Sequence, residues 1–361
     1  SEMCIRDSYI IVGKFYSRIQ VGNYELISNG DYDGMIIKYS SSGEVEGLET
    51  IGGDDEDEIT SVAVTKNNEC IVGGCFSSSS IQLGDYTLTN NKDSSFYYTN
   101  GMIVEFGNLE LNNPIVIKAE EIGGNNTECI NSVVATEDGG YIAGGYFYSA
   151  SIQIGDYILT NNGESDGMII KYSAEGEVEW ARTVGGSRDD FIESVTQTSD
   201  GGFIAGGYFF SNSIQVGDYT LTNNGESDGI IIKYDASGEV KWVKAIGGSS
   251  SDYINSIAST SDGGAIVGGY FHSDEIQVGK YKLISNGYHD GMIIKYNSRG
   301  EVEWTRNLGG DESDYINSIA STSDGGYIVV GYFNSKEIQV GEYILTVSYT
   351  HLRAHETCAD L

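Results

Sequence analysis

The stretch "SDYINSIASTSDGG" occupies residues 251–264, and the same letters return at residues 313–326. An exact echo of this kind indicates a tandem array in which each repeat forms one supersecondary unit. An Ile-Gln pair marks the same period along the chain, at Ile19, Ile81, Ile152, Ile214, Ile276 and Ile338. The step from Ile81 to Ile152 is longer than the others, because this copy carries extra residues around "KDSSFYYTN" and "GNLELNNP". We expect insertions this local to lie in loops.

A Gly-Gly pair keeps the same period and divides the chain into repeats. The pairs begin at Gly52, Gly123, Gly185, Gly247 and Gly309. We therefore expect a partial repeat at residues 9–51, repeats at 52–122, 123–184, 185–246 and 247–308, and a second partial repeat at 309–346.

The two ends of the chain do not follow this period. Residues 2–8, "EMCIRDS", and residues 347–352, "VSYTHL", can be encoded by DNA words that are reverse complements of each other. Such a pair resembles a transposase-type sequencing adapter that was translated with the gene. We predict that residues 1–8 and 347–361 are adapter scars outside the fold, and that residues 9–346 are a fragment of a longer protein.

One repeat, residues 247–308, contains four short apolar runs with turn residues between them. "YINSIAST" ends at "SDGG", a hairpin signal in which Gly supplies a positive φ. "AIVGGYF", "GMIIKYN" and "EVEWTRNLGG" follow as the second, third and fourth runs. No segment shows the apolar spacing of a helix. Each repeat is therefore predicted to be a four-stranded antiparallel sheet.

Such a sheet cannot bury both of its faces alone, so neighbouring repeats must stack face to face. Sheet twist turns a stack of this kind into a radial array. The predicted fold class is an all-β β-propeller with four-stranded antiparallel blades and a 62-residue repeat.

The strand plan looks like that of WD-repeat blades, although the marker histidine and the Trp-Asp dipeptide of that family are missing. The segments "GGSSSDYINSIASTSDGGAIVGGYF" and "DGMIIKYNSRGEVEWTRNLGG" more closely resemble the SBBP-like (seven-bladed type) β-propeller repeats of bacterial and archaeal proteins. The resemblance implies an extracellular or cell-surface protein and does not imply a defined activity.

Composition restricts the possible partners. The formal net charge of −33 makes nucleic acid and anionic membranes poor partners. The sequence contains no run of 18 apolar residues, so it predicts no membrane-spanning segment. Three cysteines, Cys70, Cys75 and Cys129, occupy positions at which other repeats mostly carry an aromatic residue. We interpret them as buried substitutes for those aromatic residues, and their spacing is not that of metal ligands. We expect a monomer.

Between the second and third runs, each repeat carries a segment such as "IQIGDYILT" at residues 152–160, which we interpret as a small extra hairpin. In propellers, the connection between the second and third strands lies on the same face as the connection to the next blade. This face should concentrate Asp, Asn and Tyr, and it is the predicted binding face.

Two acidic positions recur on this face and are the candidate site residues. The first position holds Asp57, Glu128, Asp190, Asp252 and Asp314. The second holds Asp33, Asp166, Asp228 and Asp290, with Asn100 in the copy with extra residues. Paired carboxylates could bind calcium, but Asp before Gly is a common turn residue that bonds its own backbone. We therefore predict structural carboxylates and no cofactor, with calcium or ligand binding as the alternative.

Aromatic residues recur as well. Trp180, Trp242 and Trp304 occupy one phase of the fourth strand and are expected to pack between blades, with sugar stacking as the alternative. In pairs such as Tyr208 and Phe209, side chains alternate between faces, so at most one of the two can reach solvent.

Catalysis finds little support in the sequence. His272 and His289 have no counterparts in other repeats, and no phosphate-binding glycine loop is present. We predict a non-catalytic binding or adhesion scaffold for a carbohydrate or protein ligand. The alternative is a fragment of a carbohydrate-active lyase or hydrolase, for which the symmetry-breaking copy at residues 52–122 is the place to look.

Overall fold

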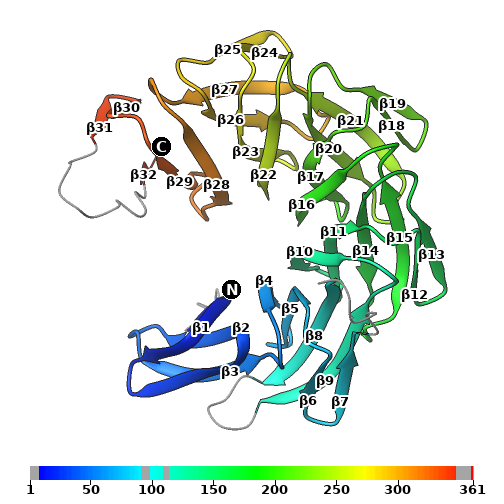
Figure 1. The fold of residues 1–361 in the computed structure, drawn as a ribbon. Coiled ribbons are helices and arrows are strands. Elements are labelled where there is room, and N and C mark those ends of the chain that lie inside the picture. The colour runs from blue at the N-terminus through cyan, green and yellow to red at the C-terminus, as the bar shows by residue number, and fades with distance from the viewer. Residues whose placement is uncertain (1–7, 91–97, 109–113, 347–358, 361) are drawn as a thin grey trace. The chain divides into compact units, whose positions relative to one another are not determined.

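The computed structural model describes residues 8–90, 98–108, 114–346 and 359–360, and these residues form β-strands joined by turns (Figure 1). The chain divides into two compact units. Unit 1 comprises Ser1–Asn161 and Ile170–Ala181, and unit 2 comprises Asn162–Ile169 and Arg182–Leu361. No helix in the described residues is long and apolar enough to cross a membrane.

The first two sheets belong to unit 1. The first has the order β1-β2-β3, and the second has the order β4-β5-β8-β9. Their strands are β1 (Ser8–Val21), β2 (Tyr24–Ser40), β3 (Val45–Ile51), β4 (Asp57–Val64), β5 (Cys70–Phe76), β8 (Asn100–Asn108) and β9 (Ile115–Ile122). A small hairpin of β6 (Ser80–Leu83) and β7 (Tyr86–Thr89) connects β5 to β8.

The next sheet has the order β10-β11-β14-β15, and the boundary between the units falls within its last two strands. Its strands are β10 (Glu128–Ala135), β11 (Tyr141–Phe147), β14 (Asp166–Tyr172) and β15 (Val178–Val184). The accompanying hairpin consists of β12 (Ser151–Ile154) and β13 (Tyr157–Thr160).

Two further sheets of four strands and a terminal sheet lie in unit 2. The orders are β16-β17-β20-β21, β22-β23-β26-β27 and β28-β29-β32. The strands of the first of these are β16 (Asp190–Gln197), β17 (Phe203–Phe209), β20 (Asp228–Tyr234) and β21 (Val240–Ile246). Those of the second are β22 (Asp252–Ser259), β23 (Ala265–Phe271), β26 (Asp290–Tyr296) and β27 (Val302–Leu308). Those of the terminal sheet are β28 (Asp314–Ser321), β29 (Tyr327–Phe333) and β32 (Ala359–Asp360).

Each sheet of unit 2 carries its own two-stranded hairpin. The hairpins are formed by β18 (Ser213–Val216) with β19 (Tyr219–Thr222), β24 (Glu275–Val278) with β25 (Tyr281–Ile284), and β30 (Glu337–Val340) with β31 (Tyr343–Thr346). The predicted fold class, an all-β chain of four-stranded antiparallel propeller-type blades, is thus confirmed. The small extra hairpin predicted between the second and third strands is also present.

The ends of the chain differ from the full repeats. The first sheet has three strands, and its strand β1 begins at Ser8, which we had counted with the N-terminal scar. At the other end, most of residues 347–361 lie outside the described residues, but Ala359 and Asp360 pair with Val329 and Ile328 of β29. The assignment of residues 347–361 to an adapter scar stays a prediction.

Consecutive sheets of one unit interlock through glycines of the second strand. A Cβ atom on Gly206 of β17 would lie 2.2 Å from the side chain of Ile257 of β22. Gly268 of β23 meets Ile316 of β28 in the same way, at 3.0 Å. The missing side chain therefore leaves the space into which an isoleucine of the next sheet packs. This close approach explains why the second strand reads "GGYF" and not a run of branched residues.

The Gly-Gly pair between sheets has a related explanation. A Cβ atom on Gly247 would lie 2.1 Å from Oδ1 of Asp228, and one on Gly248 would lie 2.9 Å from the side chain of Ser273. Both glycines thus pack directly against polar side chains of the loop region. The close packing of this loop therefore requires glycine at both positions.

We predict that Gly247→Ala destabilises the protein by about 3 kcal/mol, because an added methyl group would overlap a buried carboxylate. Gly201→Ala is the matched control. Gly201 has a φ of +78° and nothing within 4 Å of an added Cβ, so its cost should be roughly 1 kcal/mol of backbone strain. Urea unfolding of both variants provides the measurement, and equal losses would show that the loop tolerates the methyl group.

Candidate functional site

The carboxylates at the start of the first strands are buried and saturated with hydrogen-bond donors. In Asp252, Oδ1 accepts the backbone N–H groups of His272 (3.1 Å) and Ser273 (3.2 Å). Its Oδ2 accepts the Ser273 hydroxyl (2.7 Å) and the Gly248 N–H (2.8 Å). The equivalent glycine and serine groups bind Asp57, Glu128, Asp190 and Asp314. Each carboxylate thus ties the loop before its strand to the residues that follow the second strand.

The carboxylates at the start of the third strands are also buried, but only one of their oxygens is satisfied. In Asp228, Oδ2 accepts the backbone N–H (3.1 Å) and the side-chain amide (2.9 Å) of Asn224. Its Oδ1 is buried and has no hydrogen-bond partner. The same arrangement occurs in Asp33, Asp166 and Asp290, each with an asparagine shortly before it in the chain.

The structure brings these predicted residues together in pairs. Each first-strand carboxylate lies near the third-strand carboxylate that precedes it in the chain, so that their charges repel each other. The pairs that repel in this way are Asp33 with Asp57, Asp166 with Asp190, Asp228 with Asp252, and Asp290 with Asp314. In the symmetry-breaking copy the first member is Asn100 and the second is Glu128.

Burial is the main cause of the raised pKa values in these pairs. Desolvation raises the pKa of Asp190 and of Asp228 to about 6, although hydrogen bonds from Ser211 and Asn224 oppose the shift. The pKa of Glu128 rises to about 7 for the same reason. Ionisation of these buried carboxyl groups therefore lowers the stability of the folded protein.

The hydrogen bonds of these carboxylate pairs favour a structural role. The oxygens of the first-strand carboxylates already accept N–H and O–H donors, which leaves them poorly suited to a cation. Among the described residues, no group of three or more His, Cys, Asp or Glu side chains could hold a metal ion. The pairs hold the loops at which consecutive sheets meet, and ligand contact must be sought on the surface around them.

The face that carries these loops also brings together side chains that we did not predict as a group. Strand register places Phe191 opposite Tyr208, Tyr253 opposite Tyr270, and Tyr315 opposite Tyr332. These six residues, which we call the aromatic stripe, lie at the loop-facing ends of the first and second strands in three successive sheets of unit 2.

Ring contacts run through the whole stripe. Within a sheet the rings are stacked for Tyr253 with Tyr270 (centroids 4.8 Å apart) and for Tyr315 with Tyr332 (4.7 Å), and those of Phe191 and Tyr208 are tilted by 37° at 5.1 Å. Between sheets they meet edge to face, at 4.6 Å for Tyr208 with Tyr253 and 4.7 Å for Tyr270 with Tyr315. The stripe is therefore a continuous aromatic surface and not a set of separate residues.

The stripe is accessible to solvent. Tyr332 is 46% exposed, and the other five residues are half-buried. Phe209 and Phe271, which follow Tyr208 and Tyr270 in sequence, are fully buried. The alternation predicted for these Tyr-Phe pairs is confirmed.

Charged and titratable groups border the stripe. Burial raises the pKa of Glu193, which accepts a hydrogen bond from the Tyr208 hydroxyl. The Arg188 guanidinium lies 5.8 Å from the ring centre of Phe210, which contacts Tyr208 and Tyr253. The stripe thus already has one guanidinium at its border.

The two histidines also lie at the stripe. The rings of His272 and His289 are 4.6 Å apart, and His289 contacts both Tyr270 and Tyr315. Burial and the neighbouring His272 lower the pKa of His289. Sequence reasoning treated these histidines as isolated because their proximity depends on how the sheets follow each other.

Trp180, Trp242 and Trp304 were predicted to pack between sheets, and Trp242 does so. Its ring is 9% exposed and stacks against Tyr296 with centroids 6.1 Å apart. Its indole N–H donates to the Ser298 carbonyl (3.3 Å) in the following repeat. Trp180 is buried, and Trp304 is half-buried with the Arg306 guanidinium 5.3 Å from its ring centre.

The symmetry-breaking copy contains an unusual polar cluster. Glu105 stands where other repeats have buried lysines such as Lys171, and it accepts a hydrogen bond from the Tyr141 hydroxyl (2.6 Å). Glu105 is 9% exposed, Tyr141 is 2% exposed, and Tyr172 beside them is fully buried.

Comparisons with known proteins find only distant likenesses. No protein-family model matches the chain, so the likeness to SBBP-type repeats remains a resemblance. An uncharacterized WD repeat-containing protein of Acanthamoeba polyphaga mimivirus is 28% identical over 141 residues, which cover 36% of this chain and 10% of that protein. The regulatory protein FlaEY of Caulobacter vibrioides is 26% identical over 193 residues, which cover 52% of this chain and 20% of that protein.

A solved structure, the Pan2 WD40 domain of Neurospora crassa, is 10% identical with a TM-score of 0.34, and the match covers 78% of this chain and 74% of that one. The chain spans a fifth or less of the two curated relatives. The repeated four-stranded antiparallel sheets define a repeat scaffold with blades of the β-propeller type.

We predict that Asp252→Asn lowers the free energy of unfolding by about 2 kcal/mol. The amide would turn a donor toward groups that are themselves donors, which leaves buried N–H or O–H groups unpaired. Asp274→Asn on the exposed loop nearby should change stability by no more than about 0.5 kcal/mol. Equal stability of both variants in urea unfolding would contradict the structural part assigned to Asp252.

We also predict that thermal stability rises when the pH falls from 8 to 5. The pKa values of Glu128, Asp190 and Asp228 are higher in the folded protein than their ordinary values near 4, so the folded state binds protons more tightly. Their destabilising contribution is absent below about pH 4 and complete above about pH 7. His289, whose pKa is lowered by burial and by His272, has the opposite effect.

The melting temperature at fixed ionic strength, measured in steps of one pH unit, tests this expectation. Glu128→Gln should flatten the dependence between pH 5 and 7, because it removes the group whose pKa is the highest of the three. Asp274→Asn should leave the dependence unchanged. A melting temperature that falls steadily toward pH 5 would mean that these carboxylates are not destabilised by burial.

Proposed function

We propose that this chain is a non-catalytic binding scaffold whose aromatic stripe binds a basic, arginine-containing segment of a partner protein. The observation that carries the proposal is the unbroken run of ring contacts from Phe191 to Tyr332 on the loop-bearing face. Exposed tyrosines of this kind give a rigid, amphipathic contact surface at a low cost in side-chain entropy.

Two features favour an arginine-containing partner over a sugar. The rings of the stripe use much of their faces on one another, so few open platforms remain for a flat sugar ring. A guanidinium can instead lie against ring faces or edges and bond to tyrosine hydroxyls. The contact between Arg188 and Phe210 is an example of this geometry within the chain itself.

The charge of the chain supports the same choice. A net charge of −33 attracts a basic segment over a distance and speeds its association. Extracellular or cell-surface localisation stays a prediction that rests on the resemblance to SBBP-type repeats. A carbohydrate ligand is the competing outcome of the experiment below.

Fluorescein-labelled nona-arginine and nona-lysine peptides are titrated with the protein at physiological salt. We expect Tyr253→Ser combined with Tyr315→Ser to weaken nona-arginine binding about fivefold, which corresponds to roughly 1 kcal/mol of cation–π and stacking contact. Nona-lysine binding should change less than twofold. Tyr343→Ser, which removes an exposed tyrosine of β31, is the matched control.

No loss for either peptide would show that only charge attracts them, and equal losses would show that the stripe does not prefer arginine over lysine; either result would overturn the proposal. Retention of the protein on a polysaccharide such as xylan or mannan, abolished by the same two substitutions, would replace the protein ligand by a carbohydrate.

A further inference from the structure

His272 and His289 mark a place where the chain departs twice from its own repeat. His272 directly follows β23, and His289 directly precedes β26 of the same sheet. One repeat earlier, the equivalent positions hold Phe210 and Ser227. The sheet of that repeat forms with those residues, so the fold does not require a histidine at either position. Both departures introduce the same side chain, and its imidazole is the commonest metal ligand in proteins.

The structure brings these two imidazole rings together. Their centres are 4.6 Å apart, and their planes are inclined by 31°. Two imidazoles that bind one ion through nitrogens at about 2.0–2.1 Å place their ring centres roughly 4.5–5 Å apart. The observed separation therefore suits two ligands of a single metal ion.

Both histidines are attached to backbone that the fold holds in place. The N–H of His272 donates to the carbonyl of Ser251 (3.0 Å) and to Oδ1 of Asp252 (3.1 Å). The carbonyl of His289 accepts the N–H of Asp314 at 2.7 Å. The positions of both ligands are therefore set before an ion arrives, which lowers the cost of ordering them around it.

The ring of His289 is oriented by two hydroxyl groups. Its Nδ1 lies 3.0 Å from Oγ of Ser313 and 3.1 Å from the hydroxyl oxygen of Tyr315. When Nδ1 carries the proton, it donates to one of these oxygens, and Nε2 presents a lone pair to a metal ion. Hydrogen bonds of this kind orient the histidine ligands of metal sites.

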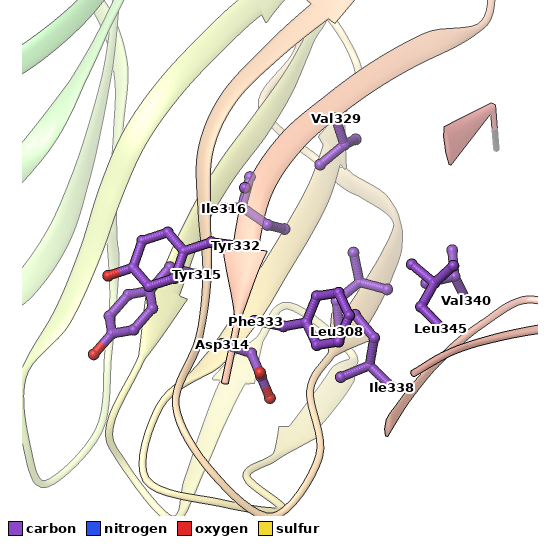
Figure 2. Close-up of a pocket in the computed structure, with 11 residues that line it drawn as sticks. Leu308, Asp314, Tyr315, Ile316, Val329, Tyr332, Phe333, Ile338, Val340 and Leu345 are labelled. Atoms are coloured by element: carbon purple, nitrogen blue, oxygen red, sulfur yellow. The ribbon is translucent and has the colours of Figure 1, made fainter. Parts of the chain in front are cut away.

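Tyr315 is itself held by its neighbour Tyr332, on which its ring stacks with centroids 4.7 Å apart. Figure 2 shows these two tyrosines together, on the side of β29 away from the apolar pocket that Phe333 and Ile338 line. The support for His289 thus comes from the aromatic stripe and not from this pocket.

The remaining nitrogens of the two rings are available to an ion. Among the described residues, the rings form hydrogen bonds only through Nδ1 of His289. His272 is exposed, so its ring can turn toward a shared ion. Burial and the neighbouring His272 lower the pKa of His289, which keeps its ring neutral at pH 7. A neutral imidazole is the form that binds metal ions.

We propose that His272 and His289 form a binding site for one divalent transition-metal ion. His289 binds the ion through Nε2, His272 binds it through one ring nitrogen, and water molecules complete the coordination. Imidazole nitrogen suits Cu²⁺, Ni²⁺ and Zn²⁺, whereas Mg²⁺ and Ca²⁺ prefer oxygen ligands. The net charge of −33 attracts cations of any kind to the surface, and the two rings select among them. The site does not rest on the proposed binding of an arginine-containing partner.

The probe is Ni²⁺, titrated into the full chain by isothermal calorimetry at pH 7, with Mg²⁺ in excess to saturate exposed carboxylates. All proteins carry His351→Asn and His355→Asn, so that His272 and His289 are the only histidines of the chain. We expect saturable binding of Ni²⁺. His272→Phe and His289→Ser, which restore the residues of the preceding repeat, should each weaken this binding at least about tenfold.

The combined variant should lose less than the product of the two single losses, because both rings act on one ion. Asp274→Asn, which removes an exposed carboxylate near His272, is the matched control and should leave Ni²⁺ binding unchanged. Urea unfolding should be the same for all variants, so that a loss of binding is not a loss of the fold. Unchanged binding in either histidine variant, single losses that multiply, or an equal loss in Asp274→Asn would overturn the proposal.

Discussion

The close approach of consecutive sheets at the second-strand glycines is the constraint on which the rest of the structure depends. Ile254 and Ile257 of β22 enter the space that a side chain on Gly206 would fill, and Ile316 and Ile319 of β28 do the same at Gly268. The sheet β22-β23-β26-β27 supplies isoleucines to its predecessor and a glycine to its successor, so both features recur at the same phase, although Val12 and Val330 occupy the glycine position in the first and last repeats. The regular period of the sequence is the result of this reciprocal packing.

The same close approach brings acidic residues into a buried position. Where consecutive sheets meet, the loop must turn sharply, and its backbone N–H groups need acceptors that water cannot supply. The carboxylates of residues such as Asp190 and Asp252 provide these acceptors. Their raised pKa values show that burial works against their ionised form, and the hydrogen bonds offset only part of this cost. The carboxylate recurs despite this cost because the loop of every repeat needs an acceptor for its N–H groups.

Much of this architecture could be predicted from the sequence, because it depends on local pattern and on repetition. The four strands, the hairpin at "IQIGDYILT" and the positive φ at the "SDGG" turn follow from turn residues and alternation, and Gly263 indeed has a φ of +80°. The pairing of Asp228 with Asp252 could not be predicted in this way. It depends on how tightly one sheet packs on the next, which their spacing along the chain does not reveal. The contact between His272 and His289 escaped prediction for the same reason.

The aromatic stripe differs from the repeated carboxylates in a way that bears on function. A structural requirement recurs in every repeat, but the two positions of the stripe hold Glu58 with Cys75 and Cys129 with Tyr146 in earlier repeats. The sheets form with these residues as well, so the fold does not require aromatic rings there. Their concentration in the three sheets from Phe191 to Tyr332 is therefore not explained by folding. This departure from the repeat is the reason why we propose the stripe, and not the repeated carboxylates, as the binding surface.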